Sequence, residues 1–201
     1  MDYAVAVLAL GLIMLGVERF LPGRNFDKVK GWHARAVCLN VAQAAVAYAA
    51  AQSWDQWFPG LAFWSLGGHG LIADALLGYF VITFVYYWWH RARHESALLW
   101  RLHQVHHSAC SLEVLTSFYK HPVEILVNGI LSSAILYALL GLDAASSGLA
   151  MLMAGAAELF YHWNVRTPHW LGYVLQRPES HCIHHCADGT VATIRIFPCG
   201  T

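Results

Sequence analysis

Five long apolar stretches constrain the fold of this chain more than any other feature. They occupy residues 3–17, 36–54, 71–89, 122–142 and 144–163. A helix needs about twenty apolar residues to cross a bilayer, and the first stretch approaches that length when Phe20 and Leu21 extend it. Hydrophobic residues make up 58% of the chain and charged residues only 12%, against about a quarter charged in soluble domains. The sequence therefore predicts a single all-α integral membrane domain over residues 1–201, a bundle of about four to five transmembrane helices.

The basic residues predict how these helices are oriented. All twelve Lys and Arg residues fall within 19–35, 91–120 and 166–195, and none falls within 52–70 or 141–148. Because cytoplasmic loops are enriched in Lys and Arg, five spans with the amino terminus outside would place every basic segment in the cytoplasm. We therefore expect an inner or plasma membrane protein with its amino terminus outside. The net charge of zero gives no indication of a nucleic-acid surface.

Histidines are concentrated just after the third apolar stretch and around the end of the chain. His90 and His94 are four residues apart, so on a helix they share one face. Two copies of a His-x-x-His-His spacing follow them, and on a helix each copy keeps its imidazoles within an arc of roughly 100°. The two copies are His103, His106, His107 and His181, His184, His185. Imidazoles aimed in one direction suit side-chain ligands of a metal ion, so the pattern predicts a metal site on the cytoplasmic side.

The number of histidines favours more than one ion. Neutral imidazole suits iron, zinc, copper and nickel, whereas magnesium and calcium prefer oxygen ligands. Eight histidines are too many for one ion with open positions, and they suit two ions with about four nitrogens each. His162 ends the fifth stretch at the same membrane level and is a ninth candidate ligand. Glu158, four residues earlier, could ligate or accept the second hydrogen bond of an imidazole. For His121 the sequence leaves three roles open: ligand, hydrogen-bond partner of a ligand, or membrane-interface residue.

Other kinds of site fit the sequence less well. The pair His94-Glu95 begins like the zinc hydrolase pattern H-E-x-x-H, but position 98 is leucine, so the pattern fails. A transmembrane haem protein would not need two His-x-x-His-His copies. We interpret the five cysteines as reduced thiols. Cys182 and Cys186 flank the last histidines, either as small packing residues or as soft metal ligands.

The histidine segments resemble the three histidine boxes of the fatty acid hydroxylase/sterol desaturase superfamily. The boxes are His90-x3-His94, His103-x2-His106-His107 and His181-x2-His184-His185. Two further segments are similar to family elements. Lys120-His121-Pro122-Val123-Glu124 resembles a basic-x-His-Pro-x-Glu element, and Tyr161-His162-Trp163-Asn164 resembles a His-x-Asn element ahead of the last box. The resemblance extends over residues 70–185, approximately.

This resemblance implies a membrane-bound non-haem di-iron oxygenase that hydroxylates or desaturates a lipid with O2. The implied cofactors are two iron ions held by the nine histidines, and zinc can replace the iron in a purified protein. Glu158, Asn164 and His121 would be supporting residues. No dinucleotide-binding fingerprint occurs in the chain, so electrons would come from a separate cytosolic donor, ferredoxin-like or cytochrome b5-like with its reductase. The lipid class stays open among sterol, fatty acyl and related substrates. The alternative is a catalytically impaired or non-enzymatic metal-binding relative.

The end of the chain departs from the family pattern. Family members continue after the last box with a segment containing Asn-Tyr and then Trp-Asp, whereas residues 192–201 read Ala-Thr-Ile-Arg-Ile-Phe-Pro-Cys-Gly-Thr. Codons for this segment can be chosen so that the same bases, translated from two bases later, encode Asn-Tyr-Ser-Asp-Ile-Pro-Leu-Trp-Asp. We therefore expect that residues 192–201 are an out-of-frame tail. Resequencing the locus tests this, because codons that cannot be reread as Asn-Tyr and Trp-Asp would exclude a frameshift.

Overall fold

The computed structural model describes residues 3–27, 29–190 and 193–196. The long helices are α1 (Tyr3–Phe20), α2 (Trp32–Ala51), α4 (Leu71–Glu95), α6 (Pro122–Ser133) and α7 (Ala144–His162). The π-helical turn η3 (Ala134–Leu139) extends α6. Within the described residues, five helical segments are long and apolar enough to cross a membrane. This confirms the predicted helical membrane bundle.

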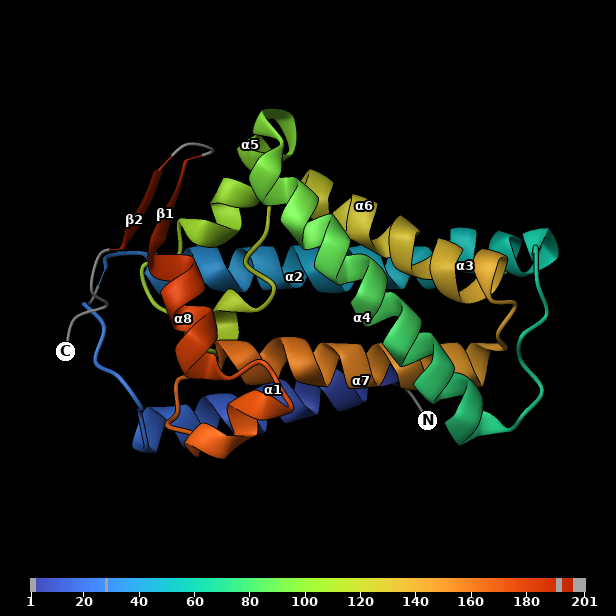
Figure 1. Ribbon diagram of the computed structural model, residues 1–201, viewed down its shortest axis with the longest axis horizontal. Helices are drawn as coiled ribbons and strands as arrows, with labels where there is room; N and C mark the ends of the chain where they lie inside the picture. The colour runs from blue at the N-terminus through green and yellow to red at the C-terminus, as the bar shows by residue number, and fades with distance from the viewer. Residues whose placement is uncertain (1–2, 28, 191–192, 197–201) are drawn as a thin grey trace.

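Shorter elements lie at the two ends of the bundle. Helix α3 (Trp54–Trp57) is at one end, and α5 (Ala97–His107) and α8 (Pro178–Cys186) are at the other (Figure 1). The 3₁₀ turns are η1 (Phe58–Leu61), η2 (Val114–Thr116) and η4 (His169–Tyr173). Helices α5 and α8 carry the two His-x-x-His-His copies, so both copies lie at the same end of the bundle.

A short β-hairpin, which the sequence analysis did not predict, follows α8. Its strands are β1 (Ala187–Thr190) and β2 (Thr193–Ile196), paired antiparallel. The second strand belongs to the segment that we interpret as an out-of-frame tail. Residues 192 and 197–201 of that segment lie outside the described residues, and the frameshift stays a prediction.

The distribution of side chains is that of a membrane protein. Phe80 and Phe84 on α4 are each 64% exposed, although a soluble protein rarely exposes a large apolar patch. The polar side chains of Asp74, Ser146 and Ser147 are buried instead. Lipid tails can solvate such an apolar exterior, while polar groups must find partners inside the bundle. The chain is therefore an integral membrane protein, and its orientation and choice of membrane stay predictions.

Helix α7 packs against α1 on one side and α4 on the other, and α2 packs along α6 (Figure 1). The close approach of α4 depends on Gly78. A Cβ built there would lie 2.9 Å from Leu136 Cδ2 and 3.1 Å from Ala150 Cβ, well inside the optimal carbon–carbon separation of about 3.5–4.0 Å. Small residues allow such close contact between membrane helices, so Gly78 sets the spacing of the bundle.

Replacing Gly78 by alanine is expected to lower the melting temperature of the detergent-purified protein. Overpacking a filled interface typically costs about 1–3 kcal/mol, and the higher helix propensity of alanine offsets about 1 kcal/mol of that cost at most. The matched control is Gly16→Ala on α1, where no atom lies within 4 Å of the added Cβ. Equal melting temperatures for the two variants would contradict the proposed packing role.

The third apolar stretch ends just before His90, but its helix does not. Helix α4 continues to Glu95, so it carries His90 directly after the apolar run and His94 about one turn later. Ser96 then breaks the helix and caps α5, its hydroxyl accepting a hydrogen bond from a backbone N–H of the first turn. The chain thereby turns at once and brings the α5 histidines back over the end of α4.

Candidate metal centre

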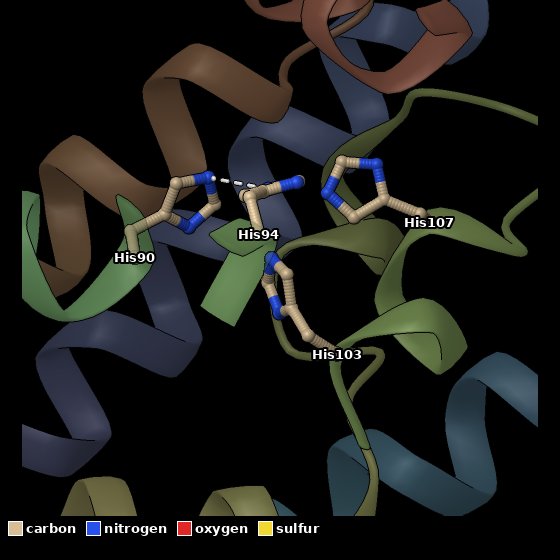
Figure 2. A group of neighbouring side chains, drawn as sticks. All are labelled: His90, His94, His103 and His107. Atoms are coloured by element: carbon tan, nitrogen blue, oxygen red, sulfur yellow. Dashed lines mark hydrogen bonds between the residues drawn. The ribbon is translucent and has the colours of Figure 1, made fainter. Parts of the chain in front are cut away.

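Nine histidines from four helices converge at this end of the bundle, and their ring nitrogens form two groups. The first group contains His90, His94, His103 and His107 (Figure 2). The second contains His106, His162, His181 and His185. Within each group, one ligand nitrogen from every residue lies within 4.8 Å of the others. His184 adjoins the first group, with its Nε2 atom 2.9 Å from His90 Nε2.

The two groups are interleaved, because each His-x-x-His-His copy contributes to both. On α5, His103 and His107 belong to the first group and His106 to the second. On α8, His181 and His185 belong to the second group, whereas His184 lies against the first. The imidazoles of each copy spread over an arc of roughly 100°, which is wide enough for them to face two neighbouring ions. Where the two groups meet, the rings of His107 and His185 stack with their centroids 4.4 Å apart.

In the second group, hydrogen bonds to backbone carbonyls determine which ring nitrogen of His106 and His162 is free to bind a metal ion. His106 Nδ1 donates to the Tyr119 carbonyl at 3.1 Å, and His162 Nδ1 donates to the Glu158 carbonyl at 2.8 Å. Each neutral ring carries one N–H, so both Nε2 atoms present bare lone pairs. These two Nε2 atoms lie 3.2 Å apart, and His181 Nε2 lies 3.1 Å from His162 Nε2.

Two bare lone pairs at that separation repel each other unless a cation lies between them. Nitrogen ligands sit about 2.1 Å from an ion such as zinc, so two ligands at a right angle are about 3 Å apart. The observed spacings of 2.9 to 3.2 Å match this value in both groups. Among the described residues, His103 Nε2 and both nitrogens of His107 are buried without a hydrogen-bond partner. The donor set therefore fits two imidazole-bound metal ions.

Burial keeps these imidazoles uncharged. Desolvation, followed by neighbouring histidines, lowers the pKa of His181 and His185 well below the usual value. Desolvation, followed by electrostatic interactions with His103 and Arg93, lowers the pKa of His184 to about 4. At neutral pH these rings are therefore unprotonated, which is the form that binds metal ions.

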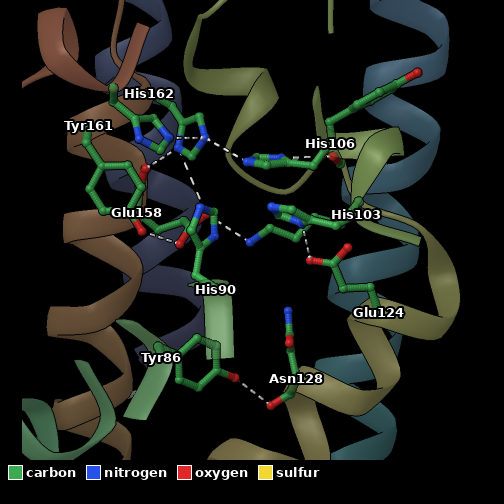
Figure 3. Close-up of polar contacts among 12 residues, drawn as sticks. Tyr86, His90, His103, His106, Glu124, Asn128, Glu158, Tyr161 and His162 are labelled. Atoms are coloured by element: carbon green, nitrogen blue, oxygen red, sulfur yellow. Dashed lines mark hydrogen bonds and ion pairs between the residues drawn. The ribbon is translucent and has the colours of Figure 1, made fainter. Parts of the chain in front are cut away.

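Two ion pairs lie beside the histidines, and of their four members the sequence analysis selected only Glu158 (Figure 3). Glu124 is buried, accepts a hydrogen bond from His103 Nδ1 at 3.1 Å and pairs with Arg93. Lys120 Nζ donates to Glu158 Oε1 at 2.8 Å. The segment Lys120-His121-Pro122-Val123-Glu124 could have indicated Lys120 and Glu124, but the sequence analysis selected His121 from it instead of the two charged residues.

The three candidate supporting residues have distinct positions. His121 caps α6, its Nδ1 accepting a hydrogen bond from Val123 N, and no contact joins it to either histidine group in the described structure. Asn164 pairs with the backbone of Arg24 through its side-chain amide. Glu158 does support His162, but through its carbonyl oxygen, because the carboxylate Oε1 lies 3.9 Å from His162 Nδ1.

Among the described residues, Cys182 does not belong to either histidine group. Cys182 is buried and lines a cavity of about 50 Å³ together with Cys110 and His185. The side chain of Cys186 lies outside the described residues. This position for Cys182 agrees with a packing residue.

Replacing Glu158 by glutamine is expected to weaken metal affinity by roughly ten- to a hundredfold while the bundle stays folded. The substitution keeps the carbonyl that holds His162 but removes the charge that pairs with Lys120. Lys120 is 9% exposed, so its unpaired charge would lie close to the two histidine groups. Metal titration of the apoprotein measures the effect, and an unchanged affinity would make Glu158 a helix-contact residue only.

The amino-acid sequence of this chain is similar to those of known lipid-modifying proteins. Residues 75–196 match the fatty acid hydroxylase family. A very-long-chain aldehyde decarbonylase of Oryza sativa subsp. indica is 33% identical over 141 residues, which cover 62% of this chain and 22% of that protein. A methylsterol monooxygenase of Arabidopsis thaliana is 44% identical over 59 residues, covering 29% of this chain and 22% of that protein. The chain thus spans about a fifth of the length of these relatives. No solved structure matches.

Proposed function

Because the chain belongs to the fatty acid hydroxylase family, we propose that it is a membrane-bound di-iron enzyme that uses O2 to hydroxylate or desaturate a lipid. The observation that carries the proposal is that the bare Nε2 atoms of His106 and His162 face each other at 3.2 Å. Imidazole ligands suit iron, and bound iron would supply the oxygen activation that no protein side chain can perform.

The protein supplies the positions of the ligands and the surroundings of the substrate. The Tyr119 and Glu158 carbonyls and the Glu124 carboxylate hold three imidazoles in one tautomer with Nε2 directed inward. Partners of this kind fix ring orientation and raise the basicity of a ligand. The two ions would be held by nine histidines: His90, His94, His103, His106, His107, His162, His181, His184 and His185.

A lipid substrate follows from the placement of the site at the end of five apolar helices. We infer that an alkyl chain or sterol enters the site from the bilayer. The related sequences are named as acting on very-long-chain aldehydes and methylsterols, so the substrate of this chain is proposed only as a lipid. Electrons would come from a separate donor of the ferredoxin or cytochrome b5 type, on the cytoplasmic side that the basic residues predict.

Metal analysis combined with untargeted lipid analysis tests this function. Protein purified in detergent should hold two iron ions per chain after anaerobic reconstitution. Cells that express the gene should contain a hydroxylated or desaturated lipid that is absent from cells expressing the His106→Ala variant. Full iron loading without any lipid difference would instead support a non-catalytic metal-binding relative.

A further inference from the structure

The loop of residues 168–176, between α7 and α8, is closed at its base by polar contacts. Thr167 precedes the loop, and Arg177 and Glu179 follow it. Thr167 N and Oγ1 each donate to the Glu179 carboxylate at 2.7 Å, and an Arg177 N–H donates to the Thr167 carbonyl at 2.9 Å. Arg177 also pairs with Glu179 at 3.2 Å. The two ends of the loop are therefore held together, and the loop projects as a unit.

The projecting part of this loop is apolar and exposed. In the described structure no residue of the turn η4 is buried. Trp170 is 64% exposed, Tyr173 is 83% exposed and Val174 is 74% exposed. Leu175, which follows directly, is exposed as well. Large apolar side chains grouped on a surface mark a site of interaction with another molecule or a membrane, so the tip of the loop requires a partner.

The position of the loop identifies that partner. In Figure 1 the long helices run horizontally, and the orange turn between α7 and α8, which contains η4, lies within the horizontal range of α1 and not beyond its end. Backbone groups tie the start of the loop to the residues after α1: Gly23 N donates to the Asn164 carbonyl at 2.8 Å, and Arg166 Nε donates to the Gly23 carbonyl at 3.2 Å. Because α1 is long and apolar enough to cross a membrane, the loop lies at the depth where the bilayer ends.

We propose that residues 168–176 form a membrane-inserting loop, with Trp170, Tyr173 and Val174 in the interfacial layer of the leaflet nearest the histidine groups. Trp and Tyr are enriched at the headgroup level because their rings are amphipathic. The apolar side of an interfacial element lies at the boundary between headgroups and acyl chains. Lipid surrounds the bundle at this depth, and the apolar surface of the loop continues that of Phe20 and Leu21, which are exposed at the end of α1.

Insertion of the loop would fix the depth of the second histidine group. Glu179, which closes the base of the loop, lies in the first turn of α8, and His181 of the second group follows it closely in the same helix. Helix α8 has 9 residues, too few to cross a bilayer. The loop therefore gives α8 an attachment to the membrane and places its histidines near the headgroup level.

Fluorine NMR of the full chain in phosphatidylcholine nanodiscs tests the insertion. Fluorotryptophan replaces tryptophan during expression, and the Trp170 signal is the one absent from Trp170→Phe. A phosphatidylcholine spin-labelled near its headgroup should broaden this signal until it is lost, because the ring lies among lipids. A water-soluble nickel chelate should leave the signal visible. Trp32 is 3% exposed, and its signal, assigned in the same way, should respond to neither agent.

Two added tryptophans are the matched controls. Tyr173→Trp places a second reporter on the loop, which should respond as Trp170 does, and it serves alone if Trp170→Phe does not fold. Asn25→Trp lies in the loop after α1, where Asn25 is exposed among polar residues. Its signal should be lost with the nickel chelate and kept with the spin-labelled lipid.

Broadening of the Trp170 signal by nickel that equals or exceeds broadening by the lipid would overturn the proposal. Protection from both agents would overturn it too, because the loop would then pack against a second copy of the chain or another protein. The assay needs neither iron nor turnover. An inserted loop on a protein that oxidises no lipid would refute the proposed function and leave the membrane contact intact.

Discussion

Replacing His106 by alanine is expected to remove the metal ion of the second histidine group and abolish lipid oxidation. His106 is buried, and its Nε2 lies 3.2 Å from that of His162. Loss of a hydrogen-bond partner behind a ligand costs roughly ten- to a hundredfold in metal affinity, so loss of a ligand itself should cost more. Iron content per chain after reconstitution measures the effect.

The companion variant His184→Ala tests whether the groups are interleaved as observed. His184 follows the second-group ligand His181 in sequence but lies 2.9 Å from His90 in the first group. Each variant should therefore lose a different ion, and the combined variant should lose both. His169→Ala is the matched control, because His169 is exposed and contacts Tyr173 instead of the histidine groups. Full iron content in both ligand variants would contradict the assignment.

The sequence was sufficient to predict the membrane bundle and to select the nine histidines that lie together in the structure, and the reason is physical. Transmembrane helices satisfy their own backbone hydrogen bonds, so the length of an apolar run nearly determines the element. All five apolar stretches correspond to helical segments that could span a membrane. The histidine spacings are likewise local, because His90 and His94 share a helix face whatever surrounds them.

The division of the histidines into two groups could not be predicted in this way. It depends on how α5 and α8 approach each other, and nothing in a His-x-x-His-His spacing specifies that angle. The supporting contacts are also long-range: Glu124 is 21 residues from His103 and 31 from Arg93. Sequence proximity favoured Glu158 as the partner of His162, and the structure uses the backbone carbonyl of that residue.

Removing the Glu124 carboxylate is expected to cause the largest loss of stability in the bundle. Arg93 and Glu124 form an ion pair in which both side chains are almost completely buried. Breaking a buried pair from one side typically costs about 3–5 kcal/mol, because the remaining charge stays buried without a partner. Glu124→Leu should therefore strongly lower the unfolding temperature in detergent. Arg91→Leu is the matched control and should have little effect, because the Arg91–Glu95 pair is exposed on α4, the helix that also carries Arg93.

The double variant Arg93→Met, Glu124→Leu separates the two roles of the carboxylate. Replacing both members of a buried pair by apolar residues of similar volume is often neutral or stabilising, so most of the lost stability should return. Metal affinity should not return, because His103 Nδ1 still lacks the acceptor that orients it, a loss worth roughly ten- to a hundredfold. Recovery of both properties would show that Glu124 only balances the charge of Arg93. Recovery of stability alone would show that the carboxylate also orients a metal ligand.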